Sequence, residues 1–486
     1  MTTTHTAPAR TTDLALHLVD GRISSATGPR RLQREDPSGS GTVTTLVPAT
    51  AEEATAAVDA AWRARAAWRR TAPAERAAAL RAAAAAVRAD AQRLGQLLTA
   101  ATGRLLGQSV ESATVAADLL EEAATTGLGA TGRTLAGATG ALDVVRREPR
   151  GVVAVITPWN DPFPAAAGLL AAALVTGNTV VHKPSERSAQ PGWEMARLVA
   201  DALPAGVLNV VNGDGETGAA IVADERVALV AHVGSTVAGR RIAAVAGARG
   251  AKVLLENGGA DAIVVDAGVD PRWAAEQIAT GAFTNTGQIC TSVERVYVHD
   301  DVADAVVSAL ADVARGLVVG DPADPATTLG PLVDAEQLAV VDQHVHAALE
   351  GGARCITGGA PLDRPGSFYP PTVLDGCAPD SDAVAEETFG PVAAIVRVPD
   401  FDTALDLAGE SRYGLAATVL TPDLGRALRA AEELEVGTVK VNGVFGGAPG
   451  GSADPRRDSG TGAGYGPDLL TEMTVLKTVH LERPGA

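Results

Sequence analysis

The segment GVVAVITPWNDPFPAAAGLLAAALVTGNTVVHK, residues 151–183, sets the pattern that decides the fold. It begins with an apolar, β-branched run that is typical of a buried strand. The alanine- and leucine-rich run at 165–177 is typical of a helix and ends at a glycine. A second short strand, 178–183, closes the segment. This order of strand, helix and strand predicts two parallel strands joined by a crossover helix.

The same alternation continues to residue 256 and begins again after residue 260. It predicts further strands at 206–211, 227–233, 251–256, 262–266, 295–300, 393–398 and 416–421. It predicts further helices at 190–203, 215–224, 235–247, 271–282 and 302–315. Strands that alternate with helices form parallel sheets covered on both faces. The predicted fold class is therefore α/β with two parallel-sheet domains.

Three other regions differ in composition from this alternating pattern. Residues 51–125 are rich in alanine and carry helical spacing, so we expect packed helices there. Residues 126–148 are rich in glycine and threonine and predict a linker or an extended excursion. Residues 446–463 are loop-like, and 474–483 are expected to form a final strand.

The composition of the chain excludes several classes of protein. With 486 residues, two or three domains are expected. The net charge of −18 disfavours a nucleic acid or an anionic membrane as a partner. Cys290, Cys355 and Cys377 form no CxxC pair, so no metal site or disulfide framework is predicted, and a cytoplasmic setting is expected. No apolar run is long enough to span a membrane. Residues 1–12 lack the apolar core of a secretory signal and are expected to be disordered.

Cys290 lies in the polar segment TNTGQICTSVE, residues 284–294, where a buried structural thiol would be unusual. A thiol nucleophile needs a base and an oxyanion donor. No histidine is near in sequence, but Glu256 ends an apolar strand in LLENGG and could serve as a base. Asn160 follows another strand and could donate its side-chain amide to an oxyanion. Each has a plainer interpretation, as an exposed strand-end acid and as a turn former.

Several loops could hold the phosphates of a dinucleotide. GDGETG, residues 213–218, fits the G-x-G-x-x-G pattern, although the expected acid about 20 residues later is missing. VGSTVAG, residues 233–239, also joins a strand to a helix, with Ser235 and Thr236 as cap and phosphate donors. Lys183 and Glu186 in HKPSE could bind a ribose diol. The plainer alternatives are a simple helix start and a surface ion pair.

Taken together, the segments resemble the aldehyde dehydrogenase superfamily, in its NAD(P)-dependent, non-acylating form. The matches follow the order of that family over about residues 30–480. They are REPRGVVAVITPWN (147–160), GNTVVHKPSE (177–186), GSTVAG (234–239), LLENGG (254–259), FTNTGQICTSVERVYV (283–298), LGPLVD (329–334), EETFGPVAAI (386–395), YGLAATVLT (413–421) and GTVKVNG (437–443).

The resemblance implies roles for the residues at matching positions. Cys290 would be the nucleophile, Glu256 would activate the hydrolytic water, and Asn160 with the Cys290 backbone N–H would hold the oxyanion. The residues implied in cofactor binding are Trp159, Lys183, Ser185, Glu186, Gly215, Gly234, Ser235, Gly239, Glu387 and Phe389. The residues implied in a substrate tunnel are Asp161, Ala165, Gly168, Thr291 and Phe445.

The implied reaction is the NAD-dependent oxidation of an aldehyde to a carboxylic acid. It would pass through a thiohemiacetal and a thioester on Cys290, which water activated by Glu256 would release. Glu186 favours NAD, because its carboxylate would repel a 2′-phosphate, and Lys183 beside it leaves NADP as a second candidate. The alternatives are a coenzyme-A-acylating relative, which typically lacks the Glu256 base, and a non-catalytic homologue.

The resemblance also implies a division of the chain and its assembly. A Rossmann-type dinucleotide-binding domain would use residues 13–125 and 149–255, and a Rossmann-type catalytic domain would span 256–445. A small β oligomerisation element would combine 126–148 with 446–486, which also hold the loop at the tunnel mouth. A homodimer or homotetramer is expected, with a small aldehyde as substrate.

The chain departs from the family pattern around the expected site. Asp161 stands where an aromatic residue is usual, and Ala165 and Gly168 stand where bulkier side chains are common. These residues predict a wide tunnel with a negative wall, suited to a large, polar or cationic aldehyde, although Asp161 could equally be a solvent-facing helix start. Asn257 and Ala260 alter the surroundings of Glu256. HVGS replaces the usual aromatic-Thr pair before Gly234, and the C-terminal glycine-rich loop is diverged.

Overall fold

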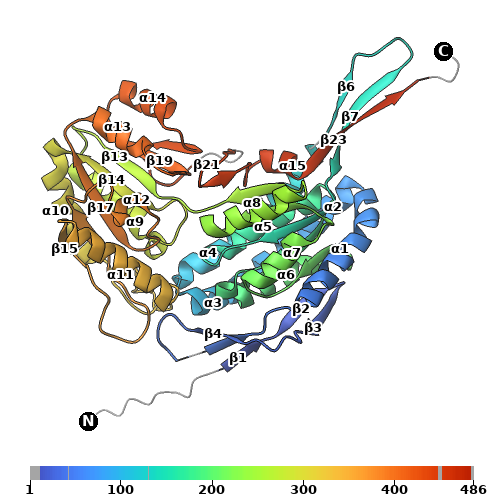
Figure 1. Cartoon of the computed structure of the whole chain (residues 1–486), viewed down its shortest axis with the longest axis horizontal. Helices are drawn as coiled ribbons and strands as arrows, with labels where there is room; N and C mark the ends of the chain where they lie inside the picture. The colour runs from blue at the N-terminus through green and yellow to red at the C-terminus, as the bar shows by residue number, and fades with distance from the viewer. Residues whose placement is uncertain (1–10, 42, 130, 447–450, 483–486) are drawn as a thin grey trace.

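Two sheets, each built mainly of parallel strands, form the body of the protein (Figure 1). The computed structural model describes residues 11–41, 43–129, 131–446 and 451–482. The strands of the first sheet lie in the order β22 (Gly460–Thr461), β12 (Lys252–Glu256), β11 (Val227–Val233), β8 (Val152–Ile156), β9 (Thr179–Lys183), β10 (Leu208–Val210), β2 (Leu16–Val19) and β3 (Arg22–Ser25). The five strands from β12 to β10 are parallel, and antiparallel strands close both edges.

Helices cover both faces of the first sheet because its strands are apolar on both sides. Along β8, Val153 and Val155 face one layer, and Val152, Ala154 and Ile156 face the other. The first layer holds α2 (Pro73–Ala89), α3 (Ala91–Thr102), α4 (Leu106–Thr126), α5 (Pro162–Val175) and α6 (Ala189–Ala200). The second holds α1 (Ala51–Arg70), α7 (Gly215–Ala223) and α8 (Thr236–Ala248).

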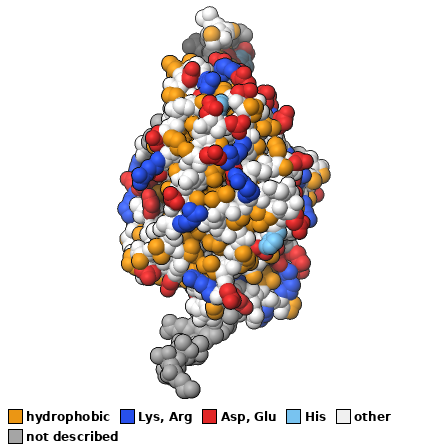
Figure 2. All heavy atoms as spheres, turned by 90° about the vertical axis from the view of Figure 1, so that its left-hand side faces the viewer, with side chains coloured by type: hydrophobic (Ala, Val, Ile, Leu, Met, Phe, Trp, Pro, Cys, Tyr) orange, Lys and Arg blue, Asp and Glu red, His pale blue; other side chains and the backbone are white. Residues whose placement is uncertain are grey.

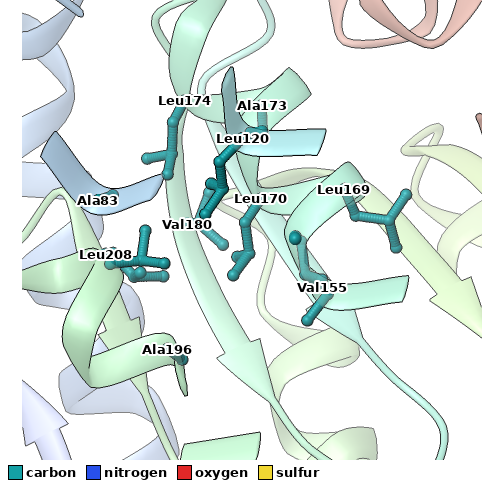
Figure 3. Close-up of a cluster of buried hydrophobic side chains, with 14 of the residues drawn as sticks. Ala83, Leu120, Val155, Leu169, Leu170, Ala173, Leu174, Val180, Ala196 and Leu208 are labelled. Carbon is teal, nitrogen blue, oxygen red and sulfur yellow. The ribbon is translucent and has the colours of Figure 1, made fainter. Parts of the chain in front are cut away.

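Helix α5 is apolar on nearly every side because it lies between the sheet and α4. Figure 3 shows Leu169, Leu170 and Leu174 of α5 among side chains of the neighbouring strands and helices. Leu120 of α4 and Val180 of β9 belong to the same buried cluster. This cluster is the core of the first sheet.

The second sheet follows in the chain and has the same construction. Its order is β15 (Arg354–Thr357), β16 (Thr372–Asp375), β17 (Val392–Val398), β14 (Val293–His299), β13 (Asp261–Val265), β19 (Ala416–Leu420) and β20 (Thr438–Val441), and only β15 is antiparallel to its neighbour. One face packs on α9 (Pro271–Phe283) and α10 (Asp300–Gly316). The other packs on α11 (Ala335–Glu350), α12 (Asp382–Ala385), α13 (Phe401–Gly409) and α14 (Leu424–Glu433). The two sheets confirm the predicted α/β class.

A third, antiparallel sheet projects from the body at the right of Figure 1. It consists of β23 (Thr474–Leu481), β7 (Leu142–Pro149) and β6 (Arg133–Leu135), with β7 in the middle. Of the two structures expected for residues 126–148, the extended excursion is therefore the one formed. The C-terminal strand pairs with β7 over its whole length, from Thr474 opposite Pro149 to Leu481 opposite Leu142.

The expected disorder of residues 1–12 is wrong for its last two residues. Thr11 and Thr12 belong to β1 (Thr11–Leu14), which pairs in parallel with β5 (Val43–Leu46). Strand β4 (Leu32–Glu35) completes this small sheet. Backbone pairing with a strand from another region extends the order to a stretch whose own sequence is polar. Residues 1–10 lie outside the described part of the chain.

The charged side chains are mixed on the surface near the second sheet. Figure 2 shows that face, with basic and acidic side chains interspersed among apolar ones and no continuous basic surface. Such a face offers no extended site for a polyanion.

The core around α5 gives a first testable prediction. Leu170 is fully buried, so Leu170→Ala should lower the free energy of unfolding by about 2–5 kcal/mol through lost burial and an unfilled cavity. Denaturant unfolding followed by circular dichroism measures the change. Leu428→Ala is the matched control, because Leu428 is 57% exposed, and it should shift stability by less than about 0.5 kcal/mol. Equal losses in both variants would contradict the described core.

Candidate active site

The carboxyl ends of the strands of the first sheet bring the expected cofactor and catalytic residues to one edge. Strand β9 ends at Lys183 and β12 ends at Glu256. Asn160 follows β8, and Gly234 follows β11. The chain runs outward from β8 to β10 and then returns to β11 on the other side of β8. Ligands of such sheets bind in the crevice at this reversal.

Glu256 is held by backbone groups from two distant segments. Its carbonyl oxygen accepts the N–H of Gly234 at 2.9 Å, and its carboxylate accepts the N–H of Gly464 at 3.0 Å. Gly464 has to be glycine for this approach, because a Cβ there would lie 2.1 Å from Glu256 Oε1. Burial raises the pKa of Glu256 to about 8, against the opposing effect of the Gly464 hydrogen bond. A carboxylate with this pKa is suited to general-base catalysis.

Cys290 lies in the loop between the turn η3 (Thr284–Gly287) and strand β14. Asn285, Thr286 and Gly287 have φ values of 50°, 58° and 72°, so three consecutive residues are left-handed. For the β-branched Thr286 this conformation is strained, and strain of this kind gathers at functional sites. Gly259 lies against the loop, because a Cβ there would be 2.6 Å from the carbonyl oxygen of Cys290. The loop that follows Glu256 therefore touches the backbone of Cys290.

The surroundings of the Cys290 thiol disfavour its ionised form. Burial, and then the charges of Asp261, Glu256, Glu387 and Asp161, raise its pKa to about 12. The thiol is therefore protonated at neutral pH until a base removes its proton.

Asn160 is buried and is joined directly to the loop of Cys290. Its side-chain Nδ2 donates to the carbonyl of Gln288 at 3.0 Å, and its own carbonyl accepts from Arg104 at 3.0 Å. Gln288 is fixed in turn, because its Oε1 accepts the N–H of Val333 at 2.9 Å. An amide nitrogen carries two N–H groups, so a second donor is left for an oxyanion.

Lys183 and Glu186 lie together in the crevice. The buried Nζ of Lys183 donates to the carbonyls of Pro184 and Gly213, each at 2.8 Å, and lies 3.8 Å from Glu186 Oε2. Burial lowers the pKa of Lys183. Glu186 is also 3.9 Å from Arg34, and it begins the turn η2 (Glu186–Ser188) that Ser185 caps.

The two glycine-rich loops differ at the helices they begin. Before α7, Asp214 accepts the N–H groups of Glu216 and Thr217 and pairs with Arg30 at 2.8 Å, so a carboxylate of the chain already occupies that helix end. A Cβ at Gly215 would meet no atom within 4 Å. Before α8, the cap is the neutral Ser235, and that N-terminus bears no carboxylate of its own. A phosphate therefore fits the start of α8 better.

The start of α8 also has polar and steric features that suit a bound dinucleotide. The hydroxyl of Thr236 is buried without a hydrogen-bond partner among the described residues. Gly239, one turn later, makes room for a neighbour, because a Cβ there would lie 2.0 Å from Asn257 Oδ1. The hydroxyl groups of Ser235 and Thr236 and the N-terminus of α8, which has no carboxylate of its own, fit a nicotinamide dinucleotide in this crevice.

Glu387 and Phe389 reach the same site from the second sheet. The Glu387 carboxylate accepts the N–H of Gly259 at 3.0 Å, and burial raises its pKa to about 7. Phe389 meets the ring of Trp159 edge to face, with 5.6 Å between the centroids. Phe389 has a φ of 51°, so a non-glycine residue is held in the left-handed region.

The turn that carries Glu387 and Phe389 is fixed by Glu294, which the sequence did not single out. The buried Glu294 carboxylate accepts the backbone N–H groups of Thr388 at 2.7 Å and of Phe389 at 2.8 Å. Burial raises the pKa of Glu294 well above its usual value. Its position in VERVYV, four residues after Cys290, could have indicated this role, because a charged residue inside an apolar strand needs a partner.

A cavity of about 290 Å³ opens beside Glu256. Its walls include Glu256, Thr291, Thr438, Lys440, Phe445 and Tyr465. Two of the five expected tunnel residues, Thr291 and Phe445, therefore line it, whereas Asp161, Ala165 and Gly168 do not. Those three share one face of α5 at helical spacing, and a Cβ at Gly168 would meet no atom within 4 Å.

Asp161 is charge-paired, which its position in the sequence did not reveal. Its Oδ1 accepts from Ser112 at 2.5 Å and lies 3.2 Å from Nη1 of Arg104. The negative wall expected of Asp161 is therefore largely neutralised. Arg104 was missed because it lies about 50 residues earlier in the chain, on the loop between α3 and α4.

The residues that depart from the family pattern have partners or surroundings of their own. Asn257 Nδ2 donates to the carbonyl of Asp458 at 3.0 Å, which joins the loop after Glu256 to the C-terminal loop. Ala260 is buried, and its carbonyl accepts from Arg295 at 2.7 Å. Burial lowers the pKa of His232 to about 4, so this ring is neutral beside Gly234.

No group of His, Cys, Asp and Glu side chains in the described part of the chain could hold a metal ion. None of the described helices is long and apolar enough to cross a membrane. All three cysteines are free.

Comparison with known proteins places the chain in a family. The model of the aldehyde dehydrogenase family matches residues 23–479. An α-ketoglutarate semialdehyde dehydrogenase of Haloferax volcanii is 35% identical, over 96% of this chain and 99% of that protein.

Two solved structures share the fold. An NAD-dependent aldehyde dehydrogenase from Sinorhizobium meliloti superposes with a TM-score of 0.93 at 32% identity, covering 98% of this chain and 96% of that one. An NADP-dependent enzyme of E. coli gives a TM-score of 0.93 at 31% identity, covering 96% and 98%. The nicotinamide cofactor is thus NAD or NADP, and the chain is an oxidoreductase of the aldehyde dehydrogenase family.

Proposed function

We propose that Cys290 is the nucleophile, Glu256 the base and Asn160 an oxyanion donor in the oxidation of an aldehyde to its acid. The loops that carry these three residues contact one another, and this contact is the main support for the proposal. Gly259 lies against the Cys290 carbonyl, and Asn160 is hydrogen-bonded to the same loop at Gln288. The loops that carry the three groups therefore adjoin one another, which supports a shared site for attack on a carbonyl carbon.

Side chains and a backbone N–H of this chain supply the nucleophile, the oxyanion donors and the base of this reaction. The Cys290 sulfur attacks the aldehyde carbon, and N–H donors of Asn160 and of the Cys290 backbone hold the oxygen that becomes negative. The nicotinamide, when bound, accepts the hydride. Cys290 then carries a thioester, and Glu256 takes a proton from the water that cleaves it.

The high pKa of the Cys290 thiol also requires a base for the first step. Glu256, with its pKa raised to about 8, is the carboxylate suited to take the thiol proton, release it to solvent, and then take a proton from the hydrolytic water. Its presence argues against transfer of the acyl group to coenzyme A. The strained and hydrogen-bonded loop argues against a non-catalytic homologue, which would not need to retain it.

The crevice suits NAD better than NADP. The expected adenosine-ribose ligand is Glu186, whose carboxylate would repel a 2′-phosphate. Lys183 and Ser185 lie beside it, and Gly234, Ser235 and Gly239 surround the pyrophosphate position at the start of α8. Trp159, Glu387 and Phe389 would bind the nicotinamide riboside, and Gly215 would lie on the adenine side. The open face of α5 at Ala165 and Gly168 leaves room for a bulky or polar substrate.

We propose that the projecting sheet joins copies of this chain in a homodimer or homotetramer. Exposed apolar side chains lie on its strands, and they are Leu135, Leu142, Val475, Leu476 and Leu481. A second copy would cover them.

We propose that residues 13–125 with 149–255 form one large domain and residues 256–445 the other. A cytoplasmic setting is proposed because the nucleophile must stay reduced.

The nucleophile is tested by removing its thiol. Cys290→Ala should lower formation of reduced cofactor by at least about a thousandfold across short aliphatic, aromatic and carboxylated aldehydes, since no other group replaces the sulfur. Cys355→Ala removes an exposed thiol instead and should keep wild-type rates. Turnover retained in Cys290→Ala would refute the assignment.

The base is tested by pH dependence. Because Glu256 must be deprotonated and its pKa is raised to about 8, kcat should fall as the pH drops below about 8. Glu256→Gln should be about a hundredfold slower or more and should lose this dependence. Glu433→Gln, which changes an exposed helix residue, is the control. The same pH profile in Glu256→Gln and wild type would show that another group is the base.

The preference for NAD is tested at Glu186. Glu186→Ala should raise kcat/KM for NADP relative to NAD by about tenfold, because Lys183 and Arg34 would then face a 2′-phosphate unopposed. Glu336→Ala removes a neighbouring exposed carboxylate that pairs with Arg187 and should leave the ratio unchanged. An unaltered ratio in Glu186→Ala would place the 2′-hydroxyl elsewhere.

A further inference from the structure

One lysine in the wall of the cavity has no carboxylate partner. The chain has four lysines, and three of them lie within 4 Å of a carboxylate: Lys183 of Glu186, Lys252 of Glu472 and Lys477 of Glu148. Lys440 makes no ion pair or hydrogen bond with any described residue, and residues 447–450 carry no acidic side chain. Its ammonium group lies 5.6 Å from the ring centroid of Phe445, which also lines the cavity.

The geometry of β20 points Lys440 into the cavity. Side chains alternate along a strand, so Thr438 and Lys440 share one face and Val439 takes the other. Val439 packs against the core of the second sheet, and both Thr438 and Lys440 line the cavity. The hydroxyl of Thr438 lies 3.2 Å from that of Tyr465, a third lining residue. The wall of the cavity therefore carries an ammonium group and two hydroxyl groups.

The other walls of the same cavity belong to the reaction centre. Glu256 and Thr291, the residue after Cys290, both line it. A substrate in this cavity would lie beside Glu256 and Thr291, which is next to Cys290 in the chain, and would also meet Lys440. Burial raises the pKa of Asp261 to about 7, and the charge of Lys440 opposes that rise, so a role in balancing this carboxylate is the competing explanation.

We infer that the aldehyde substrate bears an anionic oxygen group, a carboxylate or a phosphate, which Lys440 binds together with the hydroxyls of Thr438 and Tyr465. This inference rests on the proposed function and names the class of substrate for it. Three donors in one wall match the acceptor oxygens of such a group. Asp161 does not oppose this choice, because its carboxylate is paired with the Arg104 guanidinium and accepts a hydrogen bond from Ser112.

Steady-state kinetics with matched aldehydes tests the inference. The panel is pentanal, the semialdehydes of succinate and glutarate, glyceraldehyde 3-phosphate and a trimethylammonio-aldehyde. Wild type should prefer the anionic members over pentanal, and the better of carboxylate or phosphate identifies the group. Lys440→Met should raise KM for the anionic members about 10- to 100-fold and leave pentanal unchanged, whereas Lys440→Arg should keep the preference. Arg272→Met, which removes an exposed cation on α9, is the matched control.

Two results would overturn the inference. Equal losses for every aldehyde in Lys440→Met would show that Lys440 acts through Asp261. A wild type that prefers the neutral or the cationic member would show that no anion is selected. Glutarate binding, measured by calorimetry, needs no turnover, and it should weaken in Lys440→Met and persist in Cys290→Ala. Unchanged glutarate binding in Lys440→Met would overturn the inference alone, whereas anion-selective binding without aldehyde oxidation would overturn only the proposed function.

Discussion

The burial of the Glu256 carboxylate is the constraint on which the site depends. Two other segments of the chain meet at this residue. Gly234 at the start of α8 binds its carbonyl, Gly464 binds its carboxylate, and Gly460 of β22 pairs with its backbone. Withdrawal from water raises its pKa, and the same low-dielectric surroundings keep the Cys290 thiol protonated. The cofactor crevice, the base and the nucleophile are therefore assembled by one set of backbone contacts.

Burial on both faces explains how much of the fold could be predicted from the sequence. The strands of the two parallel sheets are continuous apolar runs, and the helices between them carry apolar residues at helical spacing. Both kinds of element could therefore be predicted from the sequence. The two-residue strand β22 was not, because Gly460 and Thr461 lie in a glycine-rich loop without periodicity. Thr11 and Thr12 are polar and gain their order only from pairing with Val43 and Thr44.

Site residues at the ends of strands could be predicted from the sequence, whereas contacts between distant side chains could not. Glu256 and Lys183 end apolar strands and Asn160 follows one, so each could be singled out as a candidate. The pairing of Asp161 with Arg104 depends on the packing of α4 against α5 and leaves no local signal. Pairing also distinguishes two charged residues: Asp161 is paired with Arg104, whereas Lys440 has no carboxylate partner among the residues that the structure describes. A charged residue near a site therefore indicates the charge of the ligand only when the ion-pair partners of that residue are known.

The most direct test of the account is to observe the covalent intermediate. Wild-type protein, mixed with aldehyde and cofactor and quenched in acid at intervals within a single turnover, would be digested and analysed by mass spectrometry. An acyl adduct is expected on the peptide that contains Cys290, formed together with the reduced cofactor and lost as the carboxylic acid appears. Reduced cofactor without any adduct, or an adduct on Cys355 or Cys377, would contradict it.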